Sequence, residues 1–175
     1  MSTQTHSPMH TPDTTVIDGR DFRKALGRFP TGVAVVTALD AQGLRLGMTI
    51  NSFSSVSLAP PIVLWSVAHK APSYAAFAAA RHFVINVLAE DQLAVSNQFS
   101  RPSEDKFAGV AWTPGLAGVP VLVGCVATFE CAVREICRAG DHDVVLGDVQ
   151  QYSHAERTPL AFALSSYARV SAIAA

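Results

Sequence analysis

The stretch GVAVVTALDAQGLRLGMTI, residues 32–50, decides the fold class. Its first half is a continuous run of β-branched and other apolar residues, which is typical of a buried strand. The tetrapeptide DAQG at 40–43 is typical of a tight turn, and a second strand-like run follows it. Two such runs joined by so short a turn predict a β-hairpin, and therefore antiparallel pairing.

Outward from this hairpin, strand-like segments outnumber helical ones. We expect further strands at 62–68, 83–88, 122–140, 142–154 and 160–170, helices at 21–29, 71–82 and 90–100, and a mostly irregular segment at 101–120. Phe22, Leu26 and Phe29 share one face of the first helix, and Pro72 and Ser73 mark the start of the second. The strands do not alternate regularly with helices, as a doubly wound parallel sheet requires. We therefore predict a mainly β, antiparallel fold with a few helices that closes, or nearly closes, into a barrel.

The composition indicates one domain that covers part of its surface with a second copy. Of the 175 residues, 49% are hydrophobic and only 15% are charged, so we expect a homo-oligomer. The net charge of −1 leaves no basic field to hold nucleic acid or an anionic membrane. No apolar run approaches the roughly 18 residues that span a bilayer.

Residues 1–18 differ in character from the rest of the chain. They are rich in Thr, Ser, Pro and His, and they lack the charged and apolar regions of a signal peptide. We expect a disordered tail over 1–18, a single domain over 19–172, and a cytoplasmic protein.

The cysteines do not suggest redox or metal chemistry. Cys125, Cys131 and Cys137 are odd in number and form no Cys-x-x-Cys pair. Two of them, Cys125 and Cys131, alternate with Ala127 and Phe129 on one apolar face of a long strand. We interpret these two as small core residues.

Neither a metal centre nor a hydrolytic site is indicated. The pairs His69 and His82, and His142 and His154, have no Cys or carboxylate partner at metal-site spacing. No G-x-S-x-G sequence is present, nor is a G-x-G-x-x-G or G-x-x-x-x-G-K sequence for nucleotide phosphates. Ligand binding remains as the main hypothesis.

The segment TINSFSSVS, residues 49–57, is the strongest candidate for that binding. Its apolar residues Ile50, Phe53 and Val56 recur every third position, and we expect them to anchor a bent strand end against the core. The other six residues are small, polar and uncharged, and such donors suit phosphate and ring carbonyl oxygens. Because neutral donors do not balance a phosphate, we expect cations from Lys70, beside Ser73 at a helix start, and from Arg101.

Six segments in order resemble the flavin reductase family, the reductases of two-component flavin-dependent monooxygenases. They are FPTGVAVVTA, GMTINSFSSVSLAPPIVLWSV, HKAPSYAAF, HFVINVLAEDQ, SNQFSRPSEDKFAGV and GDHDVVLGDV, and the resemblance covers roughly residues 20–170. It implies an FMN-binding split β-barrel, antiparallel and Greek-key-like, that forms a homodimer. It also implies that NADH or NADPH reduces FMN or FAD by hydride transfer, and that the reduced flavin passes to a partner oxygenase.

The resemblance also assigns site residues. The cofactor-binding residues that it implies are Pro30, Thr31, Gly32, Thr49, Ile50, Asn51, Ser52, Phe53, Ser54, Ser55, Trp65, Ser66, Val67, Lys70, Ser73, Phe99, Arg101 and Tyr167. His142 matches a family histidine near the nicotinamide, which it is expected to position. The segment FALSSYARV departs from the family pattern, in which His and Arg usually precede the tyrosine, so contacts from those basic residues are expected to be lost or altered.

Two alternatives stay open. Split barrels also serve as flavin- or haem-binding proteins without turnover, and the altered C-terminal segment leaves this possible. A pyridoxamine-phosphate oxidase-like enzyme ranks last, because a second phosphate calls for more basic residues than the matched segments contain.

Overall fold

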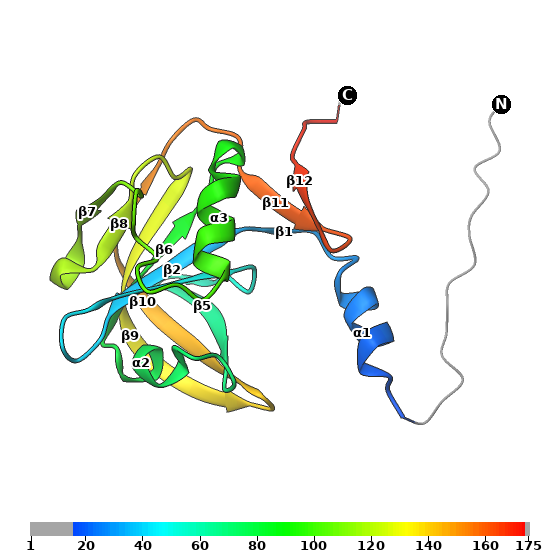
Figure 1. Ribbon diagram of the computed structural model, residues 1–175, viewed down its shortest axis with the longest axis horizontal. Coiled ribbons are helices and arrows are strands. Elements are labelled where there is room, and N and C mark those ends of the chain that lie inside the picture. The colour runs from blue at the N-terminus through cyan, green and yellow to red at the C-terminus, as the bar shows by residue number, and fades with distance from the viewer. Residues whose placement is uncertain (1–15, 174–175) are drawn as a thin grey trace.

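The computed structural model describes residues 16–173 and confirms a mainly β, antiparallel fold (Figure 1). Seven strands form the main sheet in the order β3-β2-β6-β9-β10-β5-β4, and each neighbouring pair is antiparallel. Their bounds are β2 Ala34–Leu39, β3 Arg45–Ile50, β4 Ser54–Leu58, β5 Pro61–Ala68, β6 His82–Val87, β9 Ala127–Ala139 and β10 His142–His154. The hairpin that the sequence predicts over 32–50 is present as β2 and β3, with Val36 opposite Met48.

The sheet is strongly curled. Strands β3 and β4 are its two edges, yet they follow one another in the chain through residues 51–53 alone. Ser54 is four positions after Ile50, so their Cα atoms are at most about 14 Å apart. Seven flat strands would hold the two edges about 29 Å apart. The sheet therefore bends so that its two edge strands approach each other where residues 51–53 connect them.

Two smaller sheets complete the β structure. Strands β1 Thr31–Gly32, β11 Leu160–Ala163 and β12 Ser166–Arg169 form one, and β7 Trp112–Pro114 pairs with β8 Pro120–Leu122 in the other. The segment 160–170, expected as one strand, is a hairpin because Leu164 and Ser165 both have positive φ and turn the chain. The segment 101–120 is mostly irregular, as predicted, apart from β7 and a short 3₁₀ turn, η2 Leu116–Gly118.

Three helices accompany the sheets: α1 Gly19–Leu26, α2 Tyr74–Ala79, and α3 Leu93–Ser100, which the 3₁₀ turn η1 Glu90–Gln92 precedes. Asp18 caps α1 by accepting hydrogen bonds from the amides of residues 20 and 21. The apolar face of this helix is exposed, with Phe22 50% exposed and Leu26 58%. Phe29, which was expected on the same helical face, lies beyond the end of α1 and is 75% exposed. In Figure 1, α1 stands beside the main body, next to β1 and the β11–β12 hairpin.

Two apolar clusters form the core. The larger one fills the concave side of the curled sheet around Trp65, Phe77 and Phe83. The second lies around Phe99 and Phe107, beneath α3. Phe99 packs flat against β3, where a Cβ at residue 47 would lie 2.3 Å from its ring, so only glycine fits there.

The cysteines behave as small apolar residues. Cys131 is fully buried and Cys125 is half-buried against the second cluster, as expected, although Cys125 lies just before β9 and not on it. Burial raises the pKa of the Cys131 thiol to about 12 and that of Cys125 to about 11. Both thiols are therefore protonated at neutral pH and poor nucleophiles.

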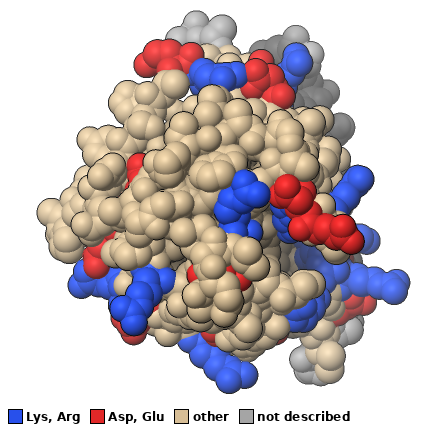
Figure 2. All heavy atoms as spheres, turned by 60° about the vertical axis from the view of Figure 1, so that its left-hand side comes forward, with Lys and Arg blue, Asp and Glu red and all other residues tan. Residues whose placement is uncertain are grey.

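Charge is sparse on the surface. On the face in Figure 2, Lys and Arg side chains alternate with Asp and Glu around large uncharged areas and form no single basic stripe. No helix among residues 16–173 has the length and apolar character to cross a membrane.

Candidate functional site

The connection between β3 and β4 holds the uncharged polar segment 49–57. Ile50 is buried, and Phe53 packs at 5.3 Å, centroid to centroid, from Phe129, so these two residues anchor the connection as predicted. Val56 does not, because it is 50% exposed. The β4–β5 register shifts between Ser55 and Ser57, and this irregularity turns residue 56 away from the core.

The hydroxyls of this segment divide into two groups. Thr49 Oγ1 donates to the carbonyl of Ser96 at 2.7 Å and so fastens β3 to α3. Ser52 Oγ accepts from the amide of Ser66 at 3.0 Å and ties the connection to β5. Asn51, Ser54 and Ser55 are exposed. These three residues therefore supply exposed uncharged donors, of which the Ser54 hydroxyl also donates to the Ser55 carbonyl at 3.2 Å.

Besides Ile50, three residues that the resemblance assigns to the cofactor have side chains in the core. Trp65 and Val67 alternate inward along β5 and are each 1% exposed, and Phe99 is fully buried on α3. The period of two along a strand sends Ser66 to the opposite face. Because the side chains of these three residues are in the core, a ligand would contact their backbone atoms, and their assignment to the cofactor stays a prediction.

The candidate phosphate ligands are exposed and unpaired. Lys70 lies between β5 and α2, and Arg101 directly follows α3. Neither side chain forms an ion pair with another residue in the range 16–173. Ser73 stands at the N-cap of α2, but its side chain makes no capping hydrogen bond. Both cations are thus exposed to solvent and without an ion pair among the described residues, although the charge of Lys70 also helps to lower the pKa of the Asp141 carboxyl.

The candidate residues near the chain ends lie around β1 and β12. Pro30 and Gly32 are exposed, whereas Thr31 pairs with Phe162 of β11 and its hydroxyl is buried with no partner among the described residues. The Tyr167 hydroxyl lies 2.9 Å from Ser96 Oγ. Tyr167 and Thr49 therefore both form a hydrogen bond with Ser96 of α3.

His142 begins β10 and is half-exposed. Its Nδ1 lies 2.7 Å from Asp141 Oδ1, and this hydrogen bond lowers the pKa of the Asp141 carboxyl. In the sheet His142 is opposite Ala68, and Ser66 is opposite Val144. Residues opposite one another share a face, and so do residues two apart on one strand. His142 and Ser66 therefore lie on the same face, and Ser52 of the β3–β4 connection contacts the backbone of Ser66.

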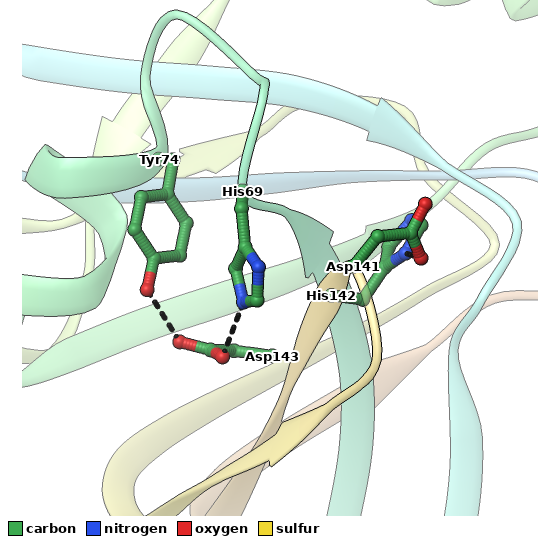
Figure 3. A network of polar contacts seen from close by, with 5 residues as sticks. All are labelled: His69, Tyr74, Asp141, His142 and Asp143. Carbon is green, nitrogen blue, oxygen red and sulfur yellow. Dashed lines mark hydrogen bonds and ion pairs between the residues drawn. The ribbon is translucent and has the colours of Figure 1, made fainter.

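A second polar group lies on the other face of the same strands (Figure 3). Asp143 is 7% exposed and accepts hydrogen bonds from His69 Nε2 and from the Tyr74 hydroxyl, each at 2.7 Å. Hydrogen bonds from His69 and then Tyr74 hold the pKa of the Asp143 carboxyl below its usual value. The hydrogen bond to the same carboxylate raises the pKa of the Tyr74 hydroxyl.

Other polar features are not part of this arrangement. A cavity of about 270 Å³ lies elsewhere, lined by residues that include Asp40, Arg81 and His82 and by none of the sequence-predicted site residues. Within residues 16–173, no three His, Cys, Asp or Glu side chains are placed to hold a metal ion.

The sequence matches the family model described as flavin reductase like domain over residues 26–171. This chain belongs to the flavin reductase-like domain family. It is 44% identical to the FMN reductase (NADH) SmoA of Agrobacterium fabrum, over 88% of this chain and 87% of the relative. It is 43% identical to the reductase component of the flavin-dependent trigonelline monooxygenase of Acinetobacter baylyi, over 85% of this chain and 48% of the relative. The chain spans about half the length of some of the curated relatives it matches.

A solved relative supports the fold of this flavin reductase-like domain. The NADH:FAD oxidoreductase SgcE6 of Streptomyces globisporus, in complex with NAD and FAD fragments, superposes with a TM-score of 0.82. The two chains are 35% identical, and the match covers 90% of this chain and 98% of that one. The resemblance seen in the sequence is thus confirmed, as is the mainly β fold.

Two residues that organise the site of this flavin reductase-like domain, Ser96 and Asp143, were not predicted from the sequence. Ser96 lies on the buried side of α3, three residues before Phe99, and a serine in such a stripe needs a partner. Asp143 occupies an inward position on β10, two residues before the buried Val145. A carboxylate in that position must be paired, which is the signal that could have found it.

Proposed function

We propose that this flavin reductase-like chain is an NAD(P)H-dependent flavin reductase that supplies reduced FMN or FAD to an oxygenase. One observation carries the proposal: the connection that holds the uncharged donors is hydrogen-bonded through Ser52 to the backbone of Ser66 on β5, and β5 pairs with β10 at the candidate nicotinamide histidine, His142. The named activities of SmoA, SgcE6 and the trigonelline monooxygenase component support it.

The residues present suit a flavin. Asn51, Ser54 and Ser55 offer exposed uncharged donors for ring carbonyl and ribityl oxygens, and short side chains let a flat ring approach the backbone. Lys70 and Arg101 are free to balance a phosphate charge. When bound, the flavin supplies the hydride acceptor, and NADH or NADPH is the donor.

The protein's own contribution is orientation. We assign His142 to positioning the nicotinamide, since its ring is half-exposed and Asp141 fixes its Nδ1 side. Amide and hydroxyl donors at 51–55 would stabilise the negative charge that a reduced ring acquires. Such a reaction needs no strong acid–base pair, because proximity and alignment carry most of the rate.

A homodimer is part of the proposal. Phe22 and Leu26 on α1, and Phe29 shortly after it, are exposed in the single chain, and charged residues are few. A second copy of the chain is the occupant that we assign to this face, because the same apolar surface is then removed from water in both copies. Three free cysteines support a reducing compartment, the cytoplasm.

The decisive experiment mixes the purified protein with NADH or NADPH and excess FMN or FAD, and follows the nicotinamide absorbance. We expect oxidation with at least one pair and little without flavin. A tightly held flavin or haem chromophore with no oxidation of either nucleotide would instead identify a non-catalytic binding protein. Adding a candidate oxygenase encoded beside this chain tests the transfer of reduced flavin.

A further inference from the structure

Two residues at the start of β10, Asp141 and Asp143, fasten the segment that leads into α2. The amide of His69 donates to the carbonyl of Asp141 at 3.0 Å. Two residues later, Asp143 uses one carboxylate oxygen for His69 and the other for Tyr74. Residues 69–74 and 141–143, far apart in the chain, therefore form one junction (Figure 3).

The chemistry of the junction makes it rigid. The carboxylate of Asp143 is buried, and both oxygens have donors, so release of either donor would leave a desolvated acceptor. The rings of His69 and Tyr74 also pack edge to face with centroids 5.1 Å apart. Arg138, opposite Asp143 in the β9–β10 register, is the other charged group that favours the ionised carboxylate.

Each half of the junction carries a candidate ligand-binding residue. Lys70 follows His69 directly, and His142 lies between Asp141 and Asp143. The side chain of His142 lies on the opposite face from that of Asp143. Figure 3 likewise shows the Asp141–His142 pair apart from the Asp143 network. Asp143 is therefore placed to act on the site only through the backbone of these two segments.

We propose that Asp143 is a positioning residue that holds Lys70 and His142 at a fixed separation and so sets the affinity for both flavin and nicotinamide. The assigned roles of Lys70 and His142 rest on the proposed function, whereas the junction itself does not. Loss of the junction would let the two segments move independently. A misplacement of such positioning groups by about 1 Å lowers catalytic efficiency by up to about a hundredfold.

The test uses the full chain and three variants. Asp143→Asn removes the charge, Tyr74→Phe removes one donor, and His69→Gln replaces the ring with an amide donor. We expect Asp143→Asn to raise both the KM for NAD(P)H and the Kd for flavin about tenfold, with kcat at saturation within about twofold. Tyr74→Phe should shift both constants in the same direction by about threefold, and His69→Gln should lie between the two.

Asp148→Asn is the matched control. Asp148 lies on the same strand and pairs with Arg134 at 2.7 Å, but on a more exposed surface. This control should leave both constants unchanged. A folded Asp143→Asn or Tyr74→Phe protein with both constants unaltered would overturn the proposal, and so would a change in kcat alone.

Amide hydrogen exchange separates the junction from the function. Faster exchange over residues 69–74 in Asp143→Asn and Tyr74→Phe, but not in Asp148→Asn, is the expected result. If the parent protein oxidises no NAD(P)H, the proposed function is wrong. Flavin titration and amide exchange then still test the positioning role of Asp143. Unchanged exchange and unchanged flavin affinity in both variants would then overturn it.

Discussion

The hydroxyl of Tyr167 lies 2.9 Å from the hydroxyl of Ser96, so the last hairpin of the chain is fastened to α3. Ser96 is fully buried, and its carbonyl also accepts from Thr49 Oγ1. One residue of α3 thus joins β3 and β12, two elements to which the resemblance assigns cofactor-binding residues.

Replacing Tyr167 with Phe should therefore lower the stability of the fold. The change leaves the buried Ser96 hydroxyl without its partner, which costs about 1 kcal/mol in the free energy of unfolding. Urea denaturation measures this cost. Tyr152→Phe is the control, since Tyr152 is 71% exposed and makes no hydrogen bond within the described residues. Equal losses in both variants would show that the hairpin contact contributes nothing specific.

Replacing His142 with Ala should raise the KM for NAD(P)H more than it weakens flavin binding. The ring is half-exposed on the face that it shares with Ser66, and its removal takes away a group that orients the nicotinamide. Steady-state kinetics and flavin titration give the two values, with His154→Ala at the far end of the same strand as control. Identical KM values in variant and parent would rule out this assignment.

The stability contributed by Asp143 should disappear in acid. Its pKa is lowered in the folded protein from an ordinary value of 3.8, so the stabilisation is complete above that value. It is lost as the pH falls through the lower pKa of the folded state. The difference in unfolding free energy between parent and Asp143→Asn should thus be constant near neutrality and shrink below about pH 4. A difference that grows in acid would contradict the sign.

Charge placed on α1 should break the homodimer. Phe22→Asp or Leu26→Asp puts a carboxylate into the apolar face that we assign to the second copy, and an unpaired buried charge is costly. Sedimentation should show a dimer for the parent and monomers for these variants. Leu44→Asp, at a residue 65% exposed in the β2–β3 turn, should remain dimeric. A monomeric parent protein would refute the assignment.

Local sequence determined the β2–β3 hairpin and the inward-facing positions of β5. The β-branched runs around DAQG were sufficient for the β2–β3 hairpin, because strand alternation and turn chemistry involve only neighbouring residues. The same alternation accounts for the inward side chains of Trp65 and Val67, which the resemblance alone had assigned to the cofactor. Ordered motifs along the chain were also enough to indicate the family.

The tertiary structure decided which polar groups remain free for a ligand. Thr49 and Ser52 resemble Ser54 and Ser55 in sequence, yet the first two are used to fasten α3 and β5. Asp143 forms hydrogen bonds with His69 and Tyr74, which lie about 70 residues away in the chain. This pairing depends on the β5–β10 register and on the placement of α2. Hydrogen bonds across such separations depend on how strands align and pack, and no local pattern encodes that alignment.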